Sequence, residues 1–95
     1  MLKIRRFDIA ELLETESDIQ EFLSETAKEG DAADFIHALG VASRAKGMSK
    51  VAKEAGVTRA SLYKSLASDG NPNFETVFKV CHALGVHLVA QPIHA

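Results

Sequence analysis

The sequence predicts an all-α fold of about five helices that ends in a short C-terminal β-strand. Two observations lead to this prediction. Capping residues and glycines divide the chain into helix-sized segments. Within these segments, apolar residues recur three and four positions apart, which is the period of a helix with one buried face. The 95 residues suffice for one core, so we expect residues 1–95 to form a single domain.

The first predicted helices begin at polar capping residues. Asp8 can open a short helix in "FDIAELLE". Ser17 opens residues 17–30, with Gln20 completing a capping box and Gly30 as a left-handed stop. Asp31 opens residues 31–47, and the glycine inside that helix, at position 40, indicates a close contact with another helix.

Three more helices and a strand complete the predicted order. Ser49 opens residues 49–56, Thr58 opens residues 58–67 and Asn73 opens residues 73–85. The helical period places the inner face of the last of these helices at Phe74, Val77, Phe78, Cys81 and Leu84. The alternating stretch "VHLVAQP" then predicts a tail strand within residues 86–95.

The composition excludes several classes of protein. An apolar run of about 18 residues is absent, so we expect no transmembrane helix. The N-terminus turns acidic where a signal peptide would be apolar, and Cys81 alone cannot form an internal disulfide. These features predict a cytoplasmic protein in a reducing compartment.

The charge is unevenly distributed along the chain, although the net charge is only −2. Residues 1–34 hold four Lys or Arg and ten Asp or Glu, whereas residues 35–95 hold seven and three. Residues 44–64 hold six basic residues and one acid, Glu54. This asymmetry indicates two different partners. The alternative is a solvated domain whose charges segregate by chance.

Residues 49–67 fit the pattern of two helices crossing over a tight turn, as in DNA-reading pairs. Such a crossing needs a small residue in the first helix, which Ala52 supplies, and a residue tolerant of positive φ in the turn, which Gly56 supplies. The apolar positions that would lock the pair are Val51, Ala55, Val57 and Leu62. Ser65 stands where an aliphatic residue is usual, so either Leu66 takes over this packing or a neighbouring small contact replaces it.

The outward face of the second helix of the pair is basic and small. Arg59 can form a fork to a guanine edge, Lys50 and Lys64 can contact phosphates, and Ser49 caps a helix N-terminus that can donate to a phosphate. The alternative is a helical hairpin with a solvated basic face. The candidate DNA-binding residues are Ser49, Lys50, Thr58, Arg59, Ala60, Ser61, Tyr63 and Lys64.

The stretch "GMSKVAKEAGVTRASLYKSLASDGNPNFETVFKVCHALGVHL" resembles the lambda-repressor-like (XRE) helix-turn-helix proteins. The whole chain is more closely similar to the addiction-module antidote subfamily of that family. The residues that match the N-terminal pattern are Phe7, Asp8, Ala10 and Leu12, and those before the helix pair are Ala42, Arg44, Ala45, Lys46, Gly47 and Met48.

This resemblance implies a lambda-repressor-like helix-turn-helix bundle with a DNA-binding core at residues 35–86. It also implies an antitoxin of a type II toxin–antitoxin module, which neutralises a small basic RelE-like ribonuclease. Such antitoxins repress their own operon as homodimers on palindromic operator DNA. A phage-type transcriptional repressor without a toxin partner remains the alternative.

Residues 1–34 form an acidic helical region that can bind a basic toxin by charge complementarity. Alternatively, its acids only solubilise two amphipathic helices. The candidate toxin-binding residues are Asp8, Glu11, Glu14, Glu21 and Glu25.

No enzymatic activity, metal site or cofactor is expected. The histidines, at positions 37, 82, 87 and 94, lack a metal-binding spacing, and His82 and His87 are separated by Gly85. Cys81 reads as a core residue, and Ser61 and Ser65 have no identifiable base. We expect a homodimer, in which the tail strand can pair with its copy across a two-fold axis.

Overall fold

The computed structural model describes residues 8–93, so Phe7 and His94 lie outside the described part of the chain. Within it, the fold is all-helical, which confirms the predicted class. The elements are a 3-10 helix, η1 (Ile9–Leu12), and five α-helices, α1 (Glu16–Glu29), α2 (Ala32–Lys46), α3 (Met48–Ala55), α4 (Arg59–Ser65) and α5 (Phe74–Ala83).

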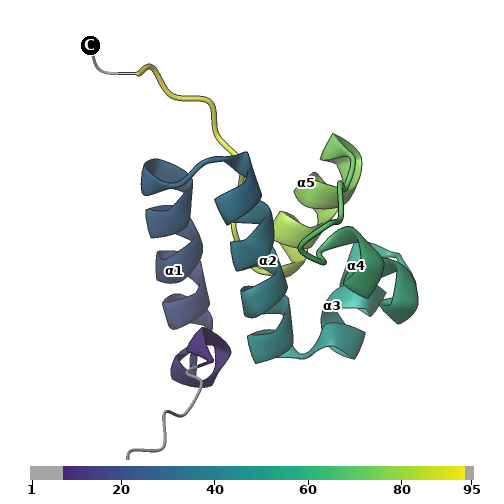
Figure 1. Cartoon of the computed structure of the whole chain (residues 1–95). Coiled ribbons are helices and arrows are strands. Elements are labelled where there is room, and N and C mark those ends of the chain that lie inside the picture. The colour runs from purple at the N-terminus through teal and green to yellow at the C-terminus, as the bar shows by residue number, and fades with distance from the viewer. Residues whose placement is uncertain (1–7, 94–95) are drawn as a thin grey trace, which may run out of the picture.

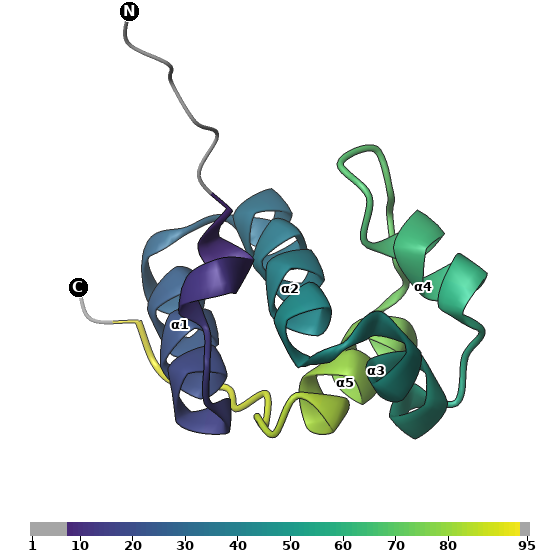
Figure 2. The ribbon, with the colours of Figure 1, turned by 90° about the horizontal axis from the view of Figure 1, so that it is seen from below.

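The helices form two groups on either side of α2. On one side, α1 runs antiparallel to α2, and η1 lies against α2 (Figures 1 and 2). On the other side, α3 packs against both α4 and α5 (Figure 2). One core joins the two groups, and its most deeply buried large side chains are Leu23, Leu39, Val51, Leu62, Val80, Cys81 and Leu84.

A capping box begins α1, two residues earlier than the sequence pattern predicts. Thr15 accepts a hydrogen bond from the Asp18 backbone N–H, and the Asp18 carboxylate accepts one from the Thr15 N–H. The predicted box of Ser17 and Gln20 is therefore wrong, because Thr15 and Asp18 satisfy the first N–H groups reciprocally. Gly30 does end α1, but in an extended conformation (φ −98°) rather than a left-handed one.

The predicted start of α2 is confirmed, and Gly40 marks a close approach to the residue that ends α4 rather than a crossing of two helices. Asp31 caps α2 and forms a reciprocal capping box with Asp34. A Cβ at Gly40 would lie 3.3 Å from the carbonyl oxygen of Leu66, just after α4. The missing side chain of Gly40 thus lets the end of α4 approach α2 closely.

The connection between α3 and α4 turns at Gly56, which adopts the left-handed conformation (φ 73°, ψ 29°). Thr58 caps α4 by accepting a hydrogen bond from the Ser61 N–H, as the sequence predicts. Leu62 and Leu66 are both buried, whereas Ser65 is half-buried, so Leu66 supplies the apolar contact that the serine lacks.

Ser49 does not cap α3, contrary to the prediction. The helix starts one residue earlier, at Met48, and Gly47 occupies the N-cap position without a side-chain hydrogen bond. Met48, the first residue of the helix, is buried in the core, whereas Ser49 is exposed.

The inner face of α5 differs in part from the predicted one. Cys81 and Leu84 are buried as expected, but Val80 is also buried, and Phe74 and Phe78 face solvent. The helix is therefore rotated about its axis relative to the predicted orientation, because the core contacts lie on the face of Val80 and Leu84.

The predicted tail strand is wrong for the described part of residues 86–95. Residues 86–93 follow α5 as an irregular segment that begins with the Val86 N–H donating to the Cys81 carbonyl oxygen. A strand needs a neighbouring strand for its backbone hydrogen bonds, and residues 8–93 contain none.

Candidate nucleic-acid interface

The exposed face of α4 gathers most of the candidate DNA-binding residues. Leu62 anchors the helix in the core, which turns the opposite side outward. The exposed residues along and just before this helix are Thr58, Arg59, Ala60, Ser61, Tyr63 and Lys64. The structure therefore brings six of the eight candidates onto one short helix and its cap.

Arg59 and Tyr63 interact on this face. The Nη2 atom of Arg59 donates to the Tyr63 hydroxyl oxygen at 3.3 Å, and the guanidinium carbon lies 5.5 Å from the centre of the tyrosine ring. The spacing of four residues places the two side chains on adjacent turns, so this pair could have been found from the sequence. Tyr63 thus restricts the orientation of the guanidinium group before any ligand binds.

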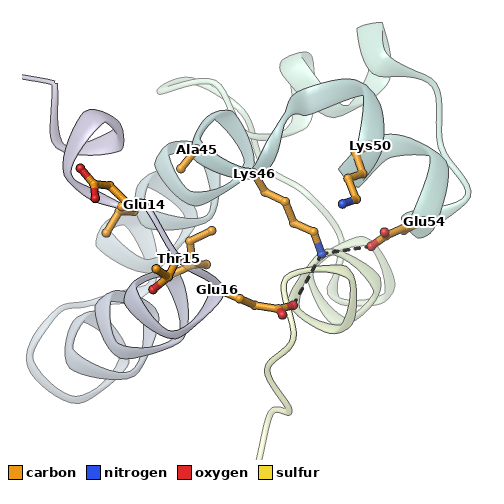
Figure 3. A pocket seen from close by; sticks show the side chains of 9 residues that line it. Glu14, Thr15, Glu16, Ala45, Lys46, Lys50 and Glu54 are labelled. Carbon is orange, nitrogen blue, oxygen red and sulfur yellow. Dashed lines mark hydrogen bonds and ion pairs between the residues drawn. The ribbon is translucent and has the colours of Figure 1, made fainter.

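Ser49 and Lys50 lie apart from the face of α4, on the first turn of α3. Both are exposed. The uncapped start of α3 leaves its first backbone N–H groups without a side-chain acceptor. Lys50 lines a pocket of about 430 Å³ that is formed by the start of α1, the end of α2 and α3 (Figure 3).

The same pocket contains a network of charges around the partly buried Lys46, whose acidic partners Glu16 and Glu54 are exposed. The Nζ atom of Lys46 lies 3.2 Å from the Glu54 carboxylate and 4.0 Å from that of Glu16 (Figure 3). The same ammonium group donates to the carbonyl oxygen of Ala83 at the end of α5. Lys46 therefore links four helices, a role that the sequence pattern did not reveal.

Two of the six basic residues in positions 44–64 are engaged in ion pairs. Lys46 is paired as described, and Arg44 lies 3.0 Å from the Asp8 carboxylate. The other four, which have no ion pair among residues 8–93, are Lys50, Lys53, Arg59 and Lys64. The positive charge available to a ligand is thus smaller than the sequence count indicates, and part of it lies on α4.

The candidate toxin-binding acids are distributed over several elements. Asp8 caps η1 by accepting a hydrogen bond from the Ala10 N–H, and that bond, together with the Arg44 pair, lowers the pKa of its carboxyl group. Glu11 is exposed on η1, and Glu14 lines the pocket. Glu21 and Glu25 are exposed one turn apart on α1. Only these last two share one helix face, opposite the buried Ile19 and Leu23.

Cys81 is buried, and desolvation raises the pKa of its thiol to about 11, which disfavours the nucleophilic thiolate at neutral pH. The rings of His82 and His87 meet edge to face, with centroids 5.9 Å apart, although Gly85 separates them in the sequence. Within residues 8–93, no three His, Cys, Asp or Glu side chains are grouped so that they could hold a metal ion.

Among residues 8–93, no helix has both the length and the apolar character needed to cross a bilayer.

Comparisons with known proteins identify the family. Residues 3–92 match the family described as probable addiction module antidote protein. An uncharacterized protein of Haemophilus influenzae is 42% identical over 89 residues, which cover 94% of this chain and 92% of that protein. No solved structure matches the chain. Because the family match covers nearly the whole sequence, the chain belongs to the probable addiction-module antidote family.

Proposed function

We propose that this chain is the antitoxin of a type II toxin–antitoxin module, and that it represses its own operon by sequence-specific DNA binding. The family description supports the antidote role. The observation that carries the DNA-binding role is the pair α3 and α4, which meet at the left-handed Gly56 and leave the basic face of α4 exposed. This arrangement is suited to a helix-turn-helix motif whose second helix enters a major groove.

The side chains on α4 divide between base reading and phosphate contacts. Arg59, oriented by Tyr63, would read a guanine edge with its two donor groups. Ala60 and Ser61 are small, so the start of the helix can approach the bases closely. Lys64 would contact a phosphate, which adds affinity without sequence preference.

The start of α3 provides a second phosphate contact in this proposal. Its first backbone N–H groups have no side-chain cap, and the hydroxyl of Ser49 is exposed beside them. A phosphate oxygen accepting from these groups would supply the missing cap and benefit from the helix dipole. Lys50, on the same turn, would add a charge at the edge of the pocket.

An electrophoretic or fluorescence binding assay with operator and random DNA tests the DNA-binding role. Arg59→Ala should reduce discrimination between the two DNAs by about 1–3 kcal/mol, because it removes a base contact. Lys64→Ala should weaken binding to both DNAs alike, because it removes a phosphate contact. If Arg59→Ala weakened binding to operator and random DNA equally, as Lys64→Ala should, this result would contradict base reading by Arg59.

We further propose that a small basic toxin of the RelE type binds the acidic face of α1, where Glu21 and Glu25 are exposed. The test is co-purification with the product of the neighbouring gene, followed by titration at several salt concentrations. Glu21→Lys should lower the affinity and its salt dependence, whereas Asp69→Lys, an equal charge change in the exposed loop after α4, should not. A chain that binds operator DNA but no neighbouring gene product would instead be a repressor without a toxin.

A further inference from the structure

The outer face of α5 exposes two aromatic rings in one stripe. Phe74 is 72% exposed and Phe78 is 48% exposed, and their ring centroids are 6.1 Å apart. The two residues lie one turn apart, so the rings form one continuous apolar surface. Exposing two neighbouring phenylalanine rings to water is unfavourable, so such a patch indicates a surface that is covered in the functional state.

Charges of opposite sign lie beside this aromatic stripe. Glu75 and Lys79 also lie one turn apart, and their side chains meet at 2.9 Å. The acid stands nearer the start of the helix and the base nearer its end. When a second copy of α5 lies antiparallel to the first, each acid therefore approaches the other copy's base, and each aromatic ring approaches the other copy's stripe. A uniformly basic or acidic partner would instead meet one unfavourable charge.

We propose that a second copy of this chain covers this face, with Phe74 packed against Phe78 of the partner subunit across a two-fold axis between antiparallel α5 helices. This inference rests on the proposed function in one respect, since a palindromic operator requires a two-fold dimer. It takes the place of the predicted pairing of tail strands, because residues 86–93 form no strand.

The size of the surface predicts a weak dimer in solution. The exposed parts of the two rings amount to on the order of 250 Å² per subunit, since a phenylalanine presents roughly 200 Å². Twice that area is well below the ~1,200 Å² of a stable interface. The copies therefore associate weakly alone and more tightly when two operator half-sites hold them side by side.

Sedimentation of the full chain without DNA, over a range of concentrations, tests this interface. Phe74→Ser/Phe78→Ser should weaken self-association roughly tenfold or more. Leu12→Ser is the matched control, because Leu12 is 57% exposed on η1 and should leave association unchanged. Circular dichroism melting shows whether each variant is folded. A wild-type chain that stays monomeric at every concentration, or an equal effect of the control, would overturn the proposal.

Charge reversal tests the antiparallel arrangement separately. Glu75→Lys and Lys79→Glu should each weaken association, and the double variant should restore it, because both charges are then exchanged in both copies. A double variant that is no better than the single variants excludes this register. A binding assay with DNA that carries a single half-site separates the two proposals. The phenylalanine variants should still bind this DNA, because one subunit suffices for it. A wild-type chain that does not bind it would contradict the DNA-binding role and leave the dimer result intact.

Discussion

Ser43 places an unsatisfied polar group in the core. Its hydroxyl oxygen is fully buried in α2 and has no hydrogen-bond partner among residues 8–93. An unsatisfied buried hydroxyl costs free energy that an apolar group of similar size does not. Ser43→Ala should therefore raise the free energy of unfolding by about 1 kcal/mol.

Urea denaturation of the wild type and Ser43→Ala measures this change. Ser24→Ala is the control, because Ser24 is exposed on α1 and its substitution should change stability little. A clear loss of stability in Ser43→Ala would show that the hydroxyl has a partner, such as an ordered water, and that the core depends on it.

Individual residues were predictable where the backbone conformation alone sets the requirement. Gly56 follows from the need for a left-handed turn, and Thr58 from the need for a cap acceptor, so both were evident from the sequence. The replacement of Ser65 by Leu66 in the core was left open, because it depends on how α4 rotates against α2. The interaction of Arg59 with Tyr63 was equally predictable, because the two residues are four positions apart on one helix.

At the scale of elements, the start of α1 should depend on pH. The backbone N–H groups of Thr15 and Glu14 donate to the Asp18 carboxylate and lower the pKa of this group below its ordinary value of 3.8. Because the folded pKa is lower than the unfolded one, the stabilisation is fully present above the unfolded value. It is lost as the pH falls through the folded value.

Asp18→Asn should therefore lower the melting temperature at pH 7, and the difference from the wild type should shrink when both are compared below the ordinary pKa of 3.8. Thermal melts followed by circular dichroism across this pH range measure the effect. Glu29→Gln, on the exposed last turn of α1, serves as the control. A difference that stays constant with pH would mean that the carboxylate charge does not support the helix start.

Helix boundaries and faces were predictable where the capping residues and the helical period agreed. The predictions were wrong where two such signals competed. The caps Asp31, Thr58 and Asn73 are confirmed, since each is followed by an uninterrupted helical segment. The start of α1 offered two overlapping box patterns, and the helical period of α5 did not define its rotation. The alternation of the tail predicts a strand, but alternation alone cannot supply the neighbouring strand with which it would pair.

For the whole molecule, the charge asymmetry of the sequence is partly neutralised by folding. Asp8 pairs with Arg44 across 36 positions, and Glu16 approaches Lys46, so acids of the N-terminal region contact bases of the second half. Such pairs depend on the packing of α1 and η1 against α2 and were not visible in the sequence. The acids on the outer face of α1, and the bases on α3 and α4 that have no ion pair among residues 8–93, therefore remain available to partners.

Lys46 connects the two groups of helices, because it contacts Glu16, Glu54 and the Ala83 carbonyl while its side chain is only 15% exposed. Lys46→Met should lower the free energy of unfolding by about 1–3 kcal/mol, mainly because it leaves the carbonyl of the buried Ala83 without its donor. Lys79→Met is the matched control: its exposed pair with Glu75 should be worth less than about 0.5 kcal/mol. Denaturation at a concentration where the chain is monomeric gives both values, and equal losses would mean that Lys46 does not hold the two helix groups together.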